Sequence, residues 1–131
     1  MTQALARVVD NEPSVVAAYL FGSRARGTAG PLGDVDVGLL IAPGADDRAI
    51  CDRVMDGLAV NLGTDRIDVL SLNRAPSPVR YRVVRDGVLV VCRQAAVLEH
   101  FVAESVLTYL DFKPVRDRAF NRLRESIIGG R

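Results

Sequence analysis

Two aspartates that alternate along a short apolar run are the first candidates for chemistry in this sequence. Asp34 and Asp36 stand two apart in the run that ends at Ile41. Side chains two apart in a β-strand project from the same face, so the spacing predicts that both carboxylates point to one side while the intervening apolar residues enter a core. Two neighbouring carboxylates repel each other, and Asp is depleted in strands. A divalent cation would remove this conflict.

A small-residue turn before the aspartates is the second candidate. The apolar run Val15–Phe21 stops at Gly22 and Ser23, and Arg24 and Arg26 follow. A strand that ends in such a turn exposes backbone N–H groups that bind anions, and guanidinium groups match phosphate oxygens. The hydroxyl of Ser23 suits a phosphate oxygen, although a simple helix cap would use the same geometry. Because Mg²⁺ takes one or two carboxylates plus substrate phosphates, we expect phosphate and metal to meet between the two strand ends.

A third carboxylate on a neighbouring strand would complete a two-metal site. The segment Arg66–Ser71 has the alternation of a strand, with Ile67 and Val69 on one face and Asp68 on the other. The plain alternative is a set of solvent-facing aspartates that serve no common purpose.

One domain has to position these residues. The 131 residues, of which 49% are hydrophobic and 25% charged, suffice for a single core and exclude a disordered chain. The formal net charge of +1 lacks the basic footprint of a nucleic-acid binder. Cys51 and Cys92 stand far apart and His100 is the single histidine, so neither a zinc site nor a redox pair is indicated. With no basic leader or long apolar run, we expect a cytoplasmic protein without a membrane segment.

Hydrophobic spacing and helix-end signals predict the order of the elements. The first half of the chain holds a helix capped by Thr2 and ended by 11–13, a strand at Val15–Phe21 and the aspartate strand at 34–41. A helix capped by Asp46 or Asp47 and ended by Gly63 follows, and then a strand at Arg66–Ser71. The remainder holds a helix capped by Ser77 and running through Arg85, a strand at Val88–Cys92 and a helical tail from Ala95 to Ile128 interrupted at Pro114. The helix before Gly63 should cover the face opposite the aspartates. Asp86 and Gly87 could instead form the tip of a hairpin, because residues 79–84 fit a helix and a strand about equally well.

The pattern around the turn resembles a known family. G-S-x-x-x-G at 22–27, followed by the D-x-D strand, is similar to the signature of the polymerase-β-like nucleotidyltransferases. It looks most like the minimal nucleotidyltransferase antitoxins, whose partners are HEPN toxins, and residues 109–114 resemble their C-terminal segment. That family usually has a Ser just before the first aspartate, where this chain has Gly33. The resemblance assigns the third carboxylate to Asp68 and favours a helix followed by a strand over the hairpin.

The resemblance implies a fold and a reaction. The fold is α/β (α+β), a small mixed sheet with helices on one face and the active cleft on the other, in a domain 1–93 with a C-terminal helical extension 94–131 that packs on it or on a partner. The reaction is Mg²⁺-dependent transfer of AMP from ATP to a tyrosine hydroxyl of a cognate HEPN ribonuclease toxin, which silences the toxin. The implied site consists of Asp34, Asp36 and Asp68, which bind two Mg²⁺ ions and catalyse, and of Gly22, Ser23, Arg24 and Arg26, which bind the nucleotide.

Several alternatives remain open at this point. Residues 22–28 fit part of a P-loop, but no Lys follows Gly27, which argues against γ-phosphoryl transfer. A non-catalytic antitoxin would block the toxin by binding alone, and a small-molecule nucleotidyltransferase usually needs an added substrate domain. The arginines of 116–124 form either a solvated helix face or an interface to an acidic partner. A homo-oligomer and a hetero-oligomer with the toxin are both compatible with the sequence, and no direct contact with nucleic acid is expected.

Overall fold

A four-stranded mixed sheet carries the acidic residues. The computed structural model describes residues 1–22, 35–111, 114, 117–118, 121–122 and 124. The elements, in chain order, are α1 (Thr2–Val9), β1 (Val15–Phe21), β2 (Val35–Ile41), α2 (Asp47–Leu62), β3 (Ile67–Ser71), α3 (Ser77–Asp86), β4 (Val88–Cys92) and α4 (Ala95–Asp111). This order matches the one expected from the sequence, including a helix rather than a hairpin before β4.

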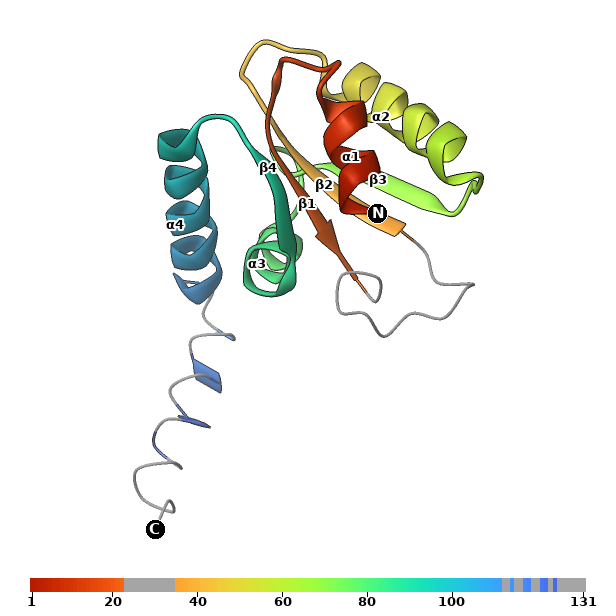
Figure 1. Ribbon diagram of the computed structural model, residues 1–131. Helices are drawn as coiled ribbons and strands as arrows, with labels where there is room; N and C mark the ends of the chain where they lie inside the picture. Colours follow the sequence, from red (N-terminus) through yellow and green to blue (C-terminus); the bar gives the residue numbers. More distant parts are fainter. Residues whose placement is uncertain (23–34, 112–113, 115–116, 119–120, 123, 125–131) are drawn as a thin grey trace.

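The strands lie in the order β3-β2-β1-β4 (Figure 1). β1 pairs antiparallel with both β2 and β4, whereas β3 runs parallel to β2. A parallel pair needs a crossover, and α2 provides it between β2 and β3. The β2–β3 ladder runs over five pairs without a shift in register, while both ladders of β1 contain one. Because the strand order begins with β3 and ends with β4, these two strands are the edges of the sheet.

One face of the sheet is closed by α1 and α2, which lie together over it in Figure 1. Alternate residues of β2, from Val35 to Ile41, point to this side and are at most 1% exposed. Leu5 of α1 and Leu58 of α2 are fully buried against them. The prediction that α2 covers the face opposite the aspartates is confirmed.

The other face is covered in part by α3 and α4. Val83 of α3 and Leu98 and Phe101 of α4 pack against Val16 and Tyr19 of β1. The expectation that helices lie on only one face is therefore wrong. Its physical reason is that β1 is apolar at successive positions, so both of its faces need cover, as in strands buried on two sides.

The ends of α2 follow the sequence signals, whereas those of α1 and α3 differ by one residue. The side chain of Asp46 accepts a hydrogen bond from the amide of Ala49 (3.1 Å), and Gly63 ends the helix with a left-handed φ of 66°. Thr2 and Ser77 were expected to cap α1 and α3, but each is already inside its helix, with Met1 and Pro76 at the cap positions.

Arg93, just after β4, joins distant parts of the chain. Its guanidinium donates hydrogen bonds to the backbone oxygens of Val9 (2.8 Å), Glu12 (2.6 Å) and Val15 (3.0 Å). These carbonyls lie at the end of α1, in the connection and at the start of β1. One side chain thus fixes the position of α1 against the sheet.

The tail is described only in part. α4 is helical to Asp111, and residues 114, 117–118, 121–122 and 124 are helical as well. The predicted extent to Ile128 and the interruption at Pro114 fall mostly on residues outside the described set. Within the described part of the chain, no helix combines the length and apolar character needed to cross a bilayer.

Candidate active site

Asp36 and Asp68 lie next to each other across the parallel pair β2–β3. Asp36 stands between Val35 and Val37, which enter the core on the α1–α2 side, so its own side chain belongs to the opposite face. Asp68 follows Ile67, which enters the same core, and is exposed. The structure therefore brings these two carboxylates to one face of the sheet, as the alternation in each strand indicated.

The local sequence places β3 at this point. After Gly63 ends α2, the hydroxyl of Thr64 accepts a hydrogen bond from the amide of Arg66 (3.1 Å). The carbonyl of Arg66 then accepts the amide of Val35 (2.9 Å), which begins the ladder with β2. This short turn after α2 leads directly into the ladder in which Asp68 stands beside Asp36.

A hollow of about 200 Å³ opens beside the acidic pair. It is lined by Asp36, Asp68, Asp65, Arg66 and Ile67. Asp65 was not singled out from the sequence, although its position three residues before Asp68, in the turn that starts the strand, was the available signal. The hollow thus combines three carboxylates with one guanidinium.

Gly22 lies against Asp36, one member of the acidic pair. Its φ of 81° belongs to the left-handed region that favours glycine, and a Cβ at this position would meet the carboxylate oxygen Oδ2 of Asp36. Phe21, the preceding residue, is paired with Asp36 across β1 and β2. The start of the predicted phosphate turn is therefore in contact with the acidic site.

The remaining predicted site residues, Ser23, Arg24, Arg26 and Asp34, lie outside the described residues. Among the residues that are described, no group of three or more potential ligand side chains is arranged to hold a metal ion. Two adjacent carboxylates on an open face nevertheless fit Mg²⁺, which keeps several waters and completes its shell with substrate phosphates rather than with a protein cage.

Adjacent Asp36 and Asp68 beside Gly22 form an arrangement compatible with metal-assisted phosphate chemistry. Residues 3–96 match the family described as polymerase beta, nucleotidyltransferase. The chain therefore belongs to the polymerase-beta nucleotidyltransferase family, as its resemblance indicated. No curated protein matches the chain significantly.

Several solved structures share the fold. A chain from a toxin–antitoxin crystal structure with AMP-PNP has a TM-score of 0.74 and 24% identity over 94% of this chain and 98% of that one. A chain from a mutant MntA-HpeT toxin–antitoxin structure has a TM-score of 0.73 and 25% identity, over 95% and 98%. A chain from the complex of tri-AMPylated Shewanella oneidensis HEPN toxin with MNT antitoxin has a TM-score of 0.65 and 23% identity, over 95% and 99%. The likeness thus extends over nearly the whole of both chains.

Proposed function

We propose that this chain is the antitoxin of a toxin–antitoxin pair and that it transfers AMP from ATP to a tyrosine hydroxyl of a HEPN-domain toxin. The observation that carries the proposal is that Asp36 stands beside Asp68 across β2 and β3 and that its carboxylate also lies against Gly22. The similar structures support the partner and the nucleotide, since one contains AMP-PNP and another a tri-AMPylated HEPN toxin. An enzyme that uses ATP to silence a ribonuclease would act in the cytoplasm.

Each site residue has a role in this reaction. Asp36 and Asp68, together with Asp34, would hold two Mg²⁺ ions, which would neutralise the phosphates and lower the pKa of the attacking hydroxyl. The backbone at Gly22 would approach the triphosphate because no side chain intervenes there. The residues proposed from the sequence pattern to bind the triphosphate are Ser23, Arg24 and Arg26.

The step itself is a displacement at the α-phosphorus of ATP. The tyrosine oxygen forms a bond to this phosphorus, the bond to the β-phosphate bridging oxygen breaks, and pyrophosphate leaves. The hydroxyl proton passes to solvent or to a site carboxylate. Asp68 is exposed on an edge strand, so a protein acceptor can approach it without a rearrangement of the sheet.

The boundary between catalytic domain and tail is also proposed, at residues 1–93 and 94–131. All described site residues precede Arg93, and α4 packs on the domain through Leu98 and Phe101. Tyr109 of α4 stacks on Tyr81 of α3, with ring centroids 4.0 Å apart and planes at 4°. Removal of 94–131 should therefore lower the melting temperature by uncovering β1, without removing any proposed ligand. An unchanged melting temperature would contradict this packing role.

The test uses ATP labelled at the α-phosphorus, Mg²⁺ and the toxin encoded beside this chain. We expect label on the toxin with the wild-type chain and with Asp56→Asn, a control on the exposed side of α2, and no label with Asp36→Asn. Toxin inhibition that survives Asp36→Asn, with no label transferred by the wild type, would establish the non-catalytic antitoxin instead. Label on a small molecule rather than on the toxin would establish the third alternative.

A further inference from the structure

The outer edge of β3 has free backbone groups. In the ladder with β2, the carbonyl of Arg66 accepts the amide of Val35, and the amide of Leu72 donates to the carbonyl of Leu39 (2.8 Å). Even-numbered residues of this strand therefore bond inward, and the odd-numbered Ile67, Val69 and Ser71 direct their backbone groups away from the sheet. Among the described residues, no backbone group accepts a hydrogen bond from these three amides.

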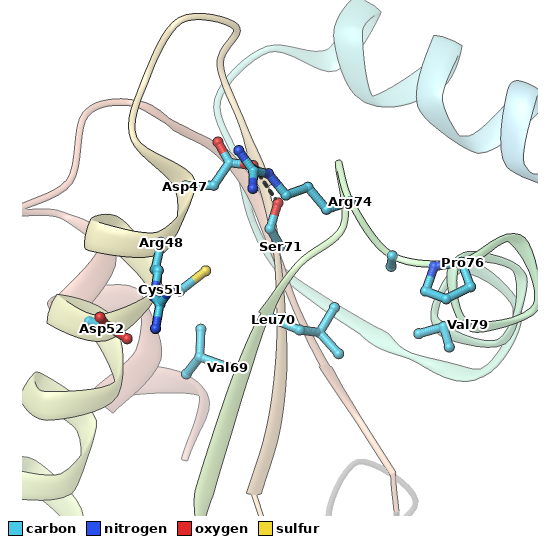
Figure 2. A pocket seen from close by; sticks show the side chains of 11 residues that line it. Asp47, Arg48, Cys51, Asp52, Val69, Leu70, Ser71, Arg74, Pro76 and Val79 are labelled. Carbon is cyan, nitrogen blue, oxygen red and sulfur yellow. Dashed lines mark hydrogen bonds and ion pairs between the residues drawn. The ribbon is translucent and has the colours of Figure 1, made fainter.

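A groove lies over the same edge, at the end of β3 away from the aspartates (Figure 2). Its volume is about 440 Å³, and α2 forms one wall while the start of α3 forms the other. Cys51 of α2 stands beside Val69 on one side of the strand, and Leu70 faces Val79 of α3 on the other. The groove thus surrounds the edge from both faces of the sheet.

Polar groups border the upper end of this groove. The hydroxyl of Ser71 donates to Oδ2 of Asp47 (2.7 Å), and Nε of Arg74 lies 3.7 Å from the same oxygen. Arg74 is 80% exposed, so its guanidinium is available to a ligand as well. Arg48 and Asp52 also line the α2 wall, while Val69, Leu70 and Val79 provide apolar surface. Apolar surface with polar groups and a row of outward amides matches an extended polypeptide, which offers both side chains and backbone acceptors.

We propose that the protein acceptor presents its tyrosine on an extended segment that adds to the free edge of β3 as a fifth strand. This inference rests on the proposed transfer to a protein hydroxyl. The groove and the hollow at Asp68 lie at the two ends of one strand, and five residues of strand span roughly 16 Å. A segment that fills the groove is therefore led along β3 to the acidic site.

Strand geometry also determines which side chains of the segment reach the site. Alternate side chains of the added strand fall on the two faces of the sheet. Those on one face meet Val69 and Cys51, and those on the other meet Leu70 and Asp68. The acceptor tyrosine belongs to the second set. A helix would not fit this edge, because its backbone amides and carbonyls bond to each other and leave the amides of β3 unpaired.

The opposite edge of the sheet does not share these features. The β1–β4 ladder has a shift in register between Ala18 and Tyr19, and such irregularities discourage the addition of a strand. The β2–β3 ladder is unbroken, and β3 also carries Asp68. The edge of β3 is therefore the one that is both regular and continuous with the site.

The first test is Val69→Pro, with Val69→Ala as its matched control. Proline at this position removes an outward amide and leaves the inward bonds of Asp68 and Leu70 intact, which an edge strand tolerates. We expect the KM for the toxin to rise about tenfold in Val69→Pro and to change at most about twofold in Val69→Ala, while ATP binding is kept in both. If Val69→Pro labels the toxin with the wild-type KM, the proposed docking on β3 is wrong, whereas the proposed transfer reaction is unaffected.

The second test needs no variant at the edge. Hydrogen exchange is measured on Asp36→Asn alone and with the toxin, so that turnover does not interfere. The amides of Ile67, Val69 and Ser71 should exchange rapidly in the free chain and gain protection with the toxin, whereas Asp68 and Leu70 are protected throughout. The proposal is wrong if the toxin adds no protection at Ile67, Val69 and Ser71. It is also wrong if protection of these amides rises with the concentration of this chain alone, since a second copy would then occupy the edge. Protection by a toxin that the wild-type chain never labels would support the docking edge and overturn the reaction.

Discussion

The two faces of the sheet differ in what their residues accomplish. The face under α1 and α2 is apolar along the whole of β2 and is closed by fully buried side chains such as Leu5 and Leu58. The face under α3 and α4 has a smaller core over β1, and the neighbouring end of β2 and β3 holds Asp36 and Asp68. Alternate side chains of β2 point to these two faces, so one strand contributes to both. One face therefore provides stability, which permits the other to keep like charges together.

The largest effect should come from the acidic face. Asp36→Asn and Asp68→Asn each remove a proposed metal ligand worth several kcal/mol in the transition state, so AMP transfer should fall roughly a thousandfold. The melting temperature should stay equal or rise, because the repulsion between adjacent carboxylates is relieved. Rate and thermal unfolding are measured together, with Asp56→Asn as the control. Unfolding of either variant would assign these residues to the structure of the strand instead.

The apolar face should show the reverse pattern. Leu58→Ala truncates a fully buried side chain and should lower the free energy of unfolding by about 2–5 kcal/mol, with transfer per folded molecule unchanged. Val60→Ala, on the same helix but 84% exposed in the native chain, should cost less than about 0.5 kcal/mol. Chemical denaturation measures both. A loss of transfer by folded Leu58→Ala would show that the faces are not separable.

Gly22 tests the contact between turn and acidic pair. Gly22→Ala and Gly44→Ala both place a side chain at a left-handed φ, of 81° and 86°, and each should cost about 1–2 kcal/mol of stability. Only at Gly22 would the new Cβ meet the carboxylate of Asp36, whereas nothing lies within 4 Å at Gly44. Transfer should therefore fall about tenfold more in Gly22→Ala than in Gly44→Ala, a difference of about 1.4 kcal/mol. Equal transfer rates in the two variants would show that Gly22 has no role in the active site.

The smallest effect concerns the pH dependence of stability that comes from the ion pair between Arg53 of α2 and Glu12. The hydrogen bond from Nε of Arg53 to Glu12 (2.6 Å) lowers the pKa of Glu12 below its ordinary value of 4.5, against an opposing contribution from burial. Because the folded pKa is the lower one, the stabilisation is complete above pH 4.5 and is lost as the pH falls through the lowered value. The difference in urea midpoint between wild type and Arg53→Gln should be constant near neutrality and shrink in acid. A constant difference down to pH 2 would contradict this linkage.

Much of the fold follows from local pattern, and the rest requires contacts that a pattern does not contain. Alternation assigned Asp36 and Asp68 each to one face of its strand, and Asp46 and Gly63 marked the ends of α2. Alternation alone did not say which residue of β3 stands beside Asp36, because that register depends on the hydrogen bonds between β2 and β3. The resemblance to a family was needed for the third aspartate.

The errors have a common physical cause. The cover of both faces was missed because it depends on α3 and α4 packing across β1 from far along the chain. Asp65 was missed because it precedes the strand and gains its place only where the turn folds beside Asp36. The positions of Asp34, Ser23, Arg24 and Arg26 remain predictions, since those residues lie outside the described set.

The three hydrogen bonds from Arg93 constrain the order in which the chain folds during synthesis. Arg93 contacts carbonyls 84, 81 and 78 positions earlier in the chain. A growing polypeptide cannot make these bonds before residue 93 has left the ribosome, by which time both aspartate strands have already emerged. The bonds that hold the end of α1 therefore form only after both aspartate strands have emerged, and a chain whose translation stops short of this arginine would lack them.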